Sequence, residues 1–445
     1  MKTSPLAPLA LLAALAVSAC DRGRPADAAA AAESPAPATA PAKPVAVALR
    51  DWPLPAPPGA AQPDLVRAPD GSLLLSWIER DGKQHQLKFA RWRDDAWSTP
   101  RTIARGSDWF VNWADTPHIT QTADGALWAH WLQKSAAAPY AYDVVLTRSG
   151  DDGATWSKPV HVNDDGTPTE HGFVSLWPAS HDRLGIAWLD GRRTAGADAH
   201  GGHDDHAAAT PAAMMTLRTA RFDAGMQRHD ERELDLSTCD CCQTDVAVSA
   251  RGPVIAYRDR TPDEIRDIQV ATLDGGFSPK RVHADNWKMP ACPVNGPSLD
   301  ARGDTVVVGW YTAAGDVPTL RLARSVDGGQ RFAAPVDVDA GTHVLGRADV
   351  AIDSDAVWLL STREDAGAQS VQLRRFAPTL EGAPQLVEVA RLQGRGRGTG
   401  FPQLAPGPDG MHVVWTDLVE GQPRLAGARV SAAENDATDT GIARR

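Results

Sequence analysis

The chain has 445 residues, 42% of them apolar, and a net charge of −11, so it can bury a core and is not disordered overall. An acidic chain has no sequence-wide electrostatic reason to bind nucleic acid, and no nucleic-acid partner is expected. Five Cys are too few for a disulfide-dense scaffold, whereas 15 Trp beside eight Phe and four Tyr is an unusual surplus.

Residues 1–20 have the pattern of an export signal. Lys2 precedes an apolar run from Leu6 to Val17, which is too short to span a bilayer. The segment Val17-Ser18-Ala19-Cys20 resembles a bacterial lipobox, which implies that Cys20 is lipidated and becomes the mature N-terminus. We therefore expect an exported lipoprotein, anchored to the bacterial cell envelope on its periplasmic side or at the cell surface. An ordinary signal peptide with an incidental Cys is the alternative.

Residues 21–44 are dominated by Ala, Pro and Ser, a composition that cannot form a core and predicts an extended tether. The globular body is expected over residues 45–430. Residues 431–445 are polar and predict a disordered tail.

Seven similar segments recur along the body, each a short apolar strand that ends in a small residue and usually Arg. Their last residues are 57, 73, 51, 52, 51 and 54 positions apart, and the long spacing contains a Gly/Ala/His-rich insertion, residues 193–213. A period of about 50 with several short strands per unit is typical of a β-propeller. The last residues of the seven segments are Arg91, Arg148, Arg221, Thr272, Arg324, Arg375 and Arg429.

The repeats predict an all-β fold, a single β-propeller of four-stranded blades, with seven blades favoured over six. The last unit ends near Val430 without an outer strand. Residues 45–50 are expected to supply that strand, because pairing the two ends removes an exposed sheet edge. A Trp precedes most repeat segments, which is typical of a core position between blades. Trp109 and Trp113 lie outside that pattern and are expected near the ligand-binding face.

Two segments, 149–156 and 325–332, fit the pattern S-x-D-x-G-x-x-aromatic. They resemble the Asp box, or BNR repeat, of sialidase-like propellers, and the resemblance covers the repeat architecture of residues 45–430. In such a hairpin the Asp caps backbone amides, the Gly takes a positive φ, and the aromatic ring tucks under the sheet. The resemblance implies structural rather than catalytic roles for Ser149, Asp151, Gly153, Trp156, Ser325, Asp327, Gly329 and Phe332.

One face of the predicted propeller collects the polar residues that follow no repeat pattern. The loops that enter each inner strand and the loops that join second and third strands share this face, where propellers usually bind ligands. Ion pairing on a solvated rim is the alternative role for its arginines. The ligand-binding candidates are Asn112, His171, Arg192, Arg258, Arg260, Arg266 and Arg347.

Four cysteines, Cys239, Cys241, Cys242 and Cys292, fall at equivalent places in two consecutive units and are expected to form one patch. Export to an oxidising compartment favours disulfides. Three pairings are possible, and bonding of the adjacent Cys241 and Cys242 is the least favoured because of ring strain. A thiolate site for Cu(I) or Zn(II) is the alternative to disulfides, and free thiols are a third. No other cofactor is expected.

His200, His203 and His206 lie in the 193–213 insertion with several Asp residues, so they are a second candidate metal site. Nothing in the surrounding Gly/Ala sequence would preorganise these ligands, and an exposed loop is the preferred interpretation.

The sialidase resemblance does not extend to catalysis. Sialidase chemistry needs an Arg cluster, a Tyr nucleophile with a Glu partner, and an Asp acid/base. The Arg-Ile-Pro motif is missing from the first unit, and Tyr257 and Tyr311 occupy the repeat position that is elsewhere Trp. The favoured function is therefore binding of a glycan, peptide or envelope protein. The alternative is a glycoside hydrolase or lyase whose carboxylates come from Asp190, Asp259, Glu264 and Asp267.

Overall fold

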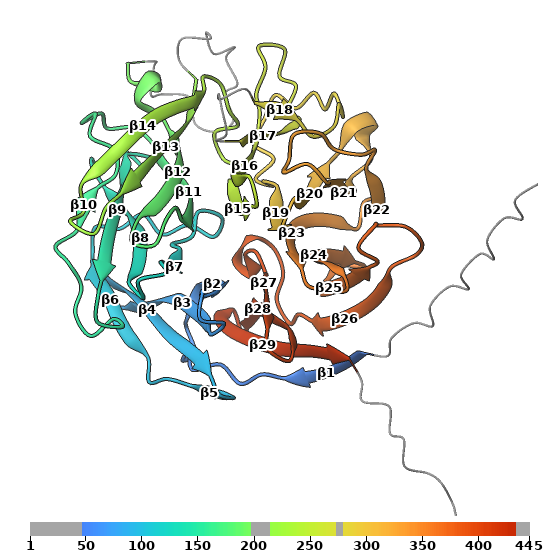
Figure 1. Cartoon of the computed structure of the whole chain (residues 1–445), viewed down its shortest axis with the longest axis horizontal. Helices are drawn as coiled ribbons and strands as arrows, with labels where there is room; N and C mark the ends of the chain where they lie inside the picture. Colours follow the sequence, from blue (N-terminus) through green and yellow to red (C-terminus); the bar gives the residue numbers. More distant parts are fainter. Residues whose placement is uncertain (1–46, 197–213, 273–278, 433–445) are drawn as a thin grey trace, which may run out of the picture. The chain divides into compact units, whose positions relative to one another are not determined.

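Seven antiparallel sheets form a closed ring (Figure 1). A computed structural model describes residues 47–196, 214–272 and 279–432. The predicted lipidation site Cys20 and the three His of the insertion lie outside these ranges. The innermost strand of each sheet contacts that of the next sheet, and the first contacts the seventh. The fold is thus an all-β propeller of seven four-stranded blades, which confirms the prediction of seven rather than six.

Blades 1 to 3 follow the chain from the channel outward, and their second strands are almost wholly apolar and buried, as in Leu184–Asp190. The outer edge of blade 1 is divided, because two separate strands pair with its third strand. Blade 1 contains β2 (Ala61–Arg67), β3 (Leu73–Asp81), β4 (Gln84–Arg93), β5 (Ala96–Trp97) and β6 (Arg101–Gly106); blade 2 contains β7 (Ile119–Gln121), β8 (Leu127–Lys134), β9 (Tyr142–Ser149) and β10 (Val160–His161); blade 3 contains β11 (His171–Pro178), β12 (Leu184–Asp190), β13 (Thr216–Phe222) and β14 (Arg228–Asp235).

Blades 4 to 6 repeat this order. Blade 4 contains β15 (Asp245–Ser249), β16 (Gly252–Arg258), β17 (Ile268–Thr272) and β18 (Lys280–Arg281); blade 5 contains β19 (Ser298–Arg302), β20 (Thr305–Thr312), β21 (Thr319–Ser325) and β22 (Val336–Ala340); blade 6 contains β23 (Val344–Ile352), β24 (Val357–Asp365), β25 (Ala368–Phe376) and β26 (Gln385–Arg391). The short 3-10 helices η1 (Arg192–Thr194), η3 (Ala314–Asp316) and η4 (Arg397–Thr399) lie in loops of the predicted ligand-binding face. Within the described residues, no helix is long and apolar enough to cross a membrane.

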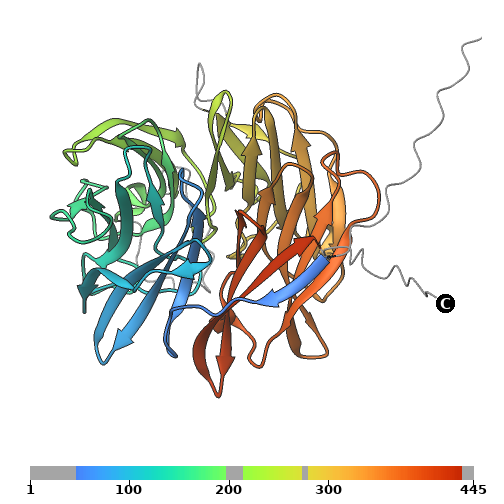
Figure 2. The ribbon, with the colours of Figure 1, turned by 60° about the horizontal axis from the view of Figure 1, so that its bottom comes forward.

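Blade 7 joins the two ends of the propeller. Its first three strands come from the end of the body, and its outer strand, β1, comes from the beginning, with Val47 opposite Ala432 and Asp51 opposite Ala428. Figure 2 shows the blue β1 beside the red β29. The predicted closure is confirmed, and it covers a sheet edge that would otherwise be unpaired. The strands of blade 7 are β27 (Gln403–Gly407), β28 (Gly410–Val419), β29 (Gln422–Ala432) and β1 (Val47–Asp51).

The Trp surplus fills the wedges between blades, as predicted. Trp128 and Trp188 of neighbouring blades belong to one buried cluster, and Tyr257 takes the equivalent place in blade 4. Trp109 was expected near the ligand-binding face, but it is buried and stacks on Trp131, with ring centroids 5.5 Å apart. It extends the apolar layer between blades 1 and 2. The fully buried Trp of the second strands are Trp77, Trp128, Trp188 and Trp310.

Two turns between third and fourth strands, on the face opposite the ligand-binding face, have the same internal hydrogen bonds. The Ser149 hydroxyl donates to Asp151 (2.7 Å) and accepts from the Gly153 amide (2.8 Å), and Asp151 accepts from the Thr155 amide (2.9 Å). Gly153 has a φ of 79°, and a Cβ there would lie 2.4 Å from Phe89 of the preceding blade. Only glycine fits both requirements. The second turn has equivalent bonds among Ser325, Asp327, Gly329 and Arg331, and the rings of Trp156 and Phe332 pack on buried clusters.

Candidate functional site

The inner strands of all seven blades surround a central channel of about 800 Å³. Five of the Asp side chains that line it come from every blade except the third and seventh and have one feature in common. Each accepts a hydrogen bond from a backbone amide in the inner strand of the next blade, so each Asp ties two blades together. The pairs are Asp64 with Ile119 (2.8 Å), Asp115 with Phe173 (2.8 Å), Asp245 with Leu299 (2.8 Å), Asp300 with Ile352 (2.7 Å) and Asp349 with Leu404 (2.6 Å).

Burial in the channel wall changes the protonation of these carboxyl groups. Desolvation raises the pKa of Asp115 to about 7, of Asp245 to about 6, and of Asp300 to about 7. Desolvation, together with the charge of Asp245, raises the pKa of Asp349 to about 8. At neutral pH several of these carboxyl groups are therefore protonated in part. The channel then carries less negative charge than its number of Asp residues indicates.

A long loop, residues 107–118, crosses the channel on the predicted ligand-binding face. Asn112 holds a turn of this loop by accepting from the Ala114 amide (2.9 Å). The Ala114 carbonyl accepts from Gln243 of blade 4 (2.8 Å), and Trp113 stacks on Phe401 of blade 7 with ring centroids 5.7 Å apart. Both contacts skip a blade, so the loop of blade 2 covers part of the channel opening.

Trp113 and Phe401 form a partly exposed aromatic platform at this opening. The guanidinium groups of Arg347 and Arg397 lie over the Trp113 ring, 5.2 Å and 5.9 Å from its centroid. The platform borders a shallow pocket of about 20 Å³. Polar side chains that line this pocket include Gln62, Thr116 and Gln403.

Arg347, a predicted ligand-binding residue, is mostly buried behind this platform. It donates to the Thr399 hydroxyl (2.7 Å) and to the carbonyl oxygens of Gly400 (3.0 Å) and Gly396 (3.1 Å). Burial lowers its pKa to about 10. Arg397, in contrast, is exposed and has no ion-pair partner within the described part of the chain. Arg347 thus positions the Trp113 ring, and Arg397 is the cation that a ligand can reach.

Arg258 joins blades 4 and 5 through backbone groups. It donates to the carbonyl oxygens of Asn295 (2.8 Å), Arg266 (2.6 Å) and Tyr311 (2.7 Å). Its guanidinium lies 5.0 Å from the Trp287 ring centroid. Burial lowers the pKa of Arg258 to about 9. This geometry is that of a structural tie, and a ligand-binding role for Arg258 stays a prediction.

The other predicted arginines and carboxylates form two separate ion-pair clusters. In blade 3, Arg192 makes two bonds with Asp190, of 2.7 Å and 2.8 Å. In blade 4, Glu264 lies 2.7 Å from Arg260 and 2.8 Å from Arg266. These pairs occupy two of the four carboxylates that were predicted as catalytic candidates.

The remaining two carboxylates of that prediction accept from neutral donors, and Asp267 also lies 3.4 Å from Arg281. Asp267 accepts from the backbone amides of Asn286 and Trp287, each at 3.1 Å. Asp259 accepts from Gln269, and burial, reinforced by the charge of Asp235, raises its pKa to about 6. None of the four predicted carboxylates lines the central channel or the pocket beside Trp113, and their catalytic role stays a prediction.

His171 lies at the start of β11 and is wholly buried. Its Nε2 lies 3.1 Å from Asp165 and 3.7 Å from Asp190, and its Nδ1 lies 3.1 Å from the Tyr142 carbonyl. These three side chains are close enough together to hold a cation. Arg192 already bonds Asp190 and lies 3.6 Å from Asp165, so the charge of this cluster is compensated by a side chain.

One cluster of the ligand-binding face was missed by sequence reasoning. The Tyr142 hydroxyl donates to Glu170 (2.6 Å) and lies 3.3 Å from Asp115. Burial, together with the charge of Asp115, raises the pKa of Glu170 to about 8. Tyr142 is 0% exposed, and Phe110 stacks on it at 4.0 Å. The cluster is a Tyr–Glu pair of the type that sialidase chemistry needs, but its tyrosine is enclosed and only Glu170 is partly exposed.

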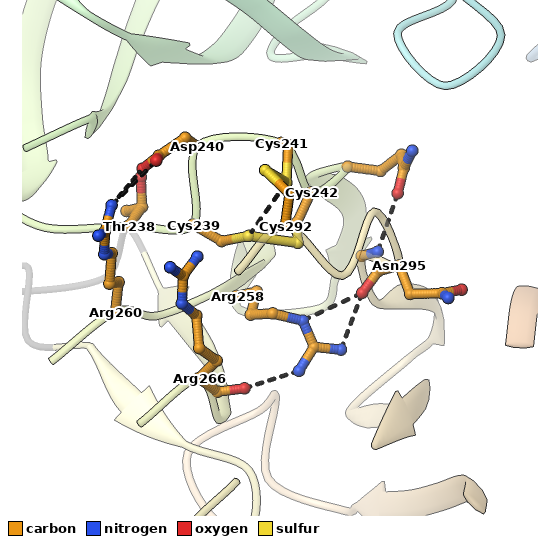
Figure 3. The surroundings of a disulfide bond; sticks show 12 residues. Thr238, Cys239, Asp240, Cys241, Cys242, Arg258, Arg260, Arg266, Cys292 and Asn295 are labelled. Atoms are coloured by element: carbon orange, nitrogen blue, oxygen red, sulfur yellow. Dashed lines mark hydrogen bonds and ion pairs between the residues drawn. A yellow bond between two sulfur atoms is a disulfide. The ribbon is translucent and has the colours of Figure 1, made fainter. Parts of the chain in front are cut away.

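The four cysteines form one patch, as predicted, and they are paired as Cys239–Cys242 and Cys241–Cys292. Figure 3 shows them between the arginines of blade 4 and the loop of Asn295. Two disulfides argue against a resident thiolate metal site. Gln243, directly after this cluster, accepts from the Gly296 amide (2.8 Å), so the disulfides fix two segments that line the channel opening.

No protein family and no curated protein matches this sequence. Solved structures with a similar fold include a protein of unknown function from Dyadobacter fermentans, with 13% identity over 84% of this chain and 95% of that chain (TM-score 0.46). The endosialidase of phage phi92 has 11% identity over 90% of this chain and 71% of that chain (TM-score 0.47). An ulvan lyase, which is a polysaccharide lyase, has 12% identity over 74% and 81% (TM-score 0.45). These likenesses are distant, and the propeller assignment rests on the seven sheets themselves.

Proposed function

We propose that the chain is a glycan-binding protein of the cell envelope, which holds its ligand at the Trp113–Phe401 platform. The observation that carries this proposal is the partly exposed aromatic pair at the channel opening, with the Arg397 guanidinium over the Trp113 ring. A pyranose ring presents one face of C–H groups, which packs on an indole, while its hydroxyl groups need hydrogen-bond partners. Gln62, Thr116 and Gln403 supply amide and hydroxyl groups beside the platform.

Arg397 makes an acidic glycan the preferred ligand. An exposed guanidinium forms paired hydrogen bonds with a carboxylate or sulfate group at little desolvation cost. The adjoining pocket, of about 20 Å³, seats one substituent of a sugar rather than a whole ring. The ligand is therefore expected to lie across the rim, and only part of it enters the pocket.

Binding is favoured over hydrolysis by the state of the candidate carboxylates. Asp190 and Glu264 are engaged by arginines, and Tyr142 of the Tyr142–Glu170 pair is wholly buried. A glycosidase needs two carboxyl groups facing an open cleft. The cell-envelope location rests on the lipobox-like segment at Cys20.

Calorimetric titration of the chain with acidic and neutral oligosaccharides tests this proposal. Trp113→Ala is expected to weaken binding of an acidic oligosaccharide at least tenfold, about 1.4 kcal/mol, because the sugar loses its stacking partner. Trp97→Ala is the matched control, since Trp97 is also partly exposed but lies on the outer strand β5. Equal affinities for the Trp113 variant and the wild type would contradict the proposal, and so would release of new reducing ends from the oligosaccharide.

A further inference from the structure

We propose that the four cysteines form a thiol–disulfide exchange site whose partner is a dithiol protein. Cys292 is the point of entry, and Cys241 passes the exchange to the buried Cys239–Cys242 bond. This activity is separate from glycan binding, because it uses neither Trp113 nor Arg397.

Exposure distinguishes the two disulfides. Cys239 and Cys242 are each 1% exposed and Cys241 is 8% exposed, whereas Cys292 is only partly buried. A thiolate must reach a sulfur atom directly to attack it, so an external partner is directed to the Cys241–Cys292 bond. Cys292 is the accessible sulfur of that bond.

The two disulfides are close enough for internal exchange. The Sγ atoms of Cys239 and Cys241, which belong to different disulfides, are 3.9 Å apart. Cys241 follows Cys239 by two residues, and both lie on a loop fixed at one end by the bond from the Cys239 amide to the Arg258 carbonyl (3.0 Å). A thiolate formed on Cys241 would therefore lie close enough to attack the Cys239–Cys242 disulfide.

A buried guanidinium provides positive charge beside this cluster. Arg266 is 2% exposed, and Figure 3 shows its guanidinium pointing toward the loop that carries Cys239. Its Nε and Nη2 lie 3.2 Å and 2.8 Å from Glu264, but its Nη1 has no hydrogen-bond partner among the described residues. A cationic neighbour stabilises a thiolate and the negative charge that is shared by three sulfur atoms during exchange.

The exchange with the partner has two steps, and the internal exchange between the two disulfides follows them. A thiolate of the dithiol partner bonds to Cys292 Sγ, the Cys241–Cys292 bond breaks, and Cys241 leaves as a thiolate; the partner's second thiol, after losing its proton, then displaces Cys292, which takes up a proton. The partner is oxidised by two electrons and the Cys241–Cys292 pair is reduced by two. In the internal step the Cys241 thiolate bonds to Cys239 Sγ and Cys242 leaves as a thiolate, with no net change of oxidation state.

Substitution of the entry cysteine tests the internal step without a partner. In the full chain carrying Cys292→Ser, acid quenching, alkylation and peptide mass spectrometry should find one thiol among the three remaining cysteines of the cluster, divided between Cys241 and Cys242. In the matched variant Cys241→Ser the label should stay on Cys292. If the label is confined to Cys241 in the first variant, or is found on cysteines other than Cys292 in the second, the proposed internal step is wrong.

The wild-type chain tests the entry step and does not depend on the folding of a variant. Reduced thioredoxin, regenerated by its reductase and NADPH, should reduce one disulfide per native chain well before the second, and Cys292 should be labelled in every singly reduced chain. Native chains that consume no NADPH, or that are labelled first at Cys239, would overturn the proposal.

Arg266 acts as a positioning residue in this scheme. In the Cys292→Ser background, Arg266→Gln should move the pH midpoint of thiol alkylation upward, and Arg266→Lys should restore it, since Lys keeps the charge. An unchanged midpoint in the Gln variant, with an unchanged thermal unfolding midpoint, would remove Arg266 from the scheme.

Discussion

The carboxyl groups of the channel determine how the stability of the propeller depends on pH. Burial raises the pKa of Asp300 to about 7 and that of Asp349 to about 8. In the unfolded chain an Asp has a pKa of about 3.9, so the folded state binds these protons more tightly. The stability that they contribute is complete below the unfolded value and is lost as pH rises through the folded value.

Thermal unfolding should therefore occur at a lower temperature at pH 8.5 than at pH 5.5. Asp349→Asn should flatten this dependence, because an amide keeps an oxygen for the Leu404 amide but does not titrate in this range. Differential scanning calorimetry across this interval measures both effects. A midpoint that rises with pH, or a variant with the wild-type slope, would show that these groups stay charged when buried.

Which face a residue occupies was predictable from sequence, but its partners were not. Trp113 lies at the channel opening as expected, because the loop before an inner strand must reach that face. Trp109, four residues earlier, is buried against Trp131 of the same blade. The contacts of Arg347 with three groups around η4 were not predicted, and its ligand-binding role stays a prediction. Such contacts depend on loop conformations that the repeat spacing does not encode.

At the scale of elements, the turns on the opposite face join neighbouring blades as well as neighbouring strands. Gly153 combines a positive φ with close contact to Phe89 of the preceding blade. The sequence pattern of this turn was recognisable because the positive φ and the close contact both require glycine at the same position. The Asp residues of the channel had a weaker signal, since Asp64, Asp115, Asp245, Asp300 and Asp349 lie 51, 130, 55 and 49 positions apart, which is close to the repeat spacing except across blade 3.

A pair of glycine substitutions separates the two demands on Gly153. Gly153→Ala and Gly166→Ala both place a side chain at a positive φ, of 79° and 68°, which costs about 1–2 kcal/mol. Nothing lies within 4 Å of a Cβ at Gly166, whereas Phe89 would lie 2.4 Å from one at Gly153. Gly153→Ala should therefore lower the free energy of unfolding by a further 1–3 kcal/mol or so in urea titration. Equal losses would mean that the turn moves away from Phe89 freely.

At the scale of the whole molecule, the propeller is a rigid ring with a partial cover. The number of blades and the closure by β1 followed from repeat spacing and from the missing strand of the last unit. The loop 107–118 was different, because it contacts blades 4 and 7 as well as its neighbours. Contacts that skip a blade leave no periodic trace in a sequence. Of the platform that these contacts build, the sequence analysis located only Trp113.

Saturation-transfer difference NMR with an acidic oligosaccharide tests the central claim most directly. If the ligand stacks on the Trp113–Phe401 platform, the C–H protons of one sugar face should receive the strongest saturation from the protein. Trp113→Ala should abolish this transfer, and Trp97→Ala should preserve it. Strong transfer that persists in the Trp113 variant, or none from the wild-type chain, would contradict glycan binding at this platform.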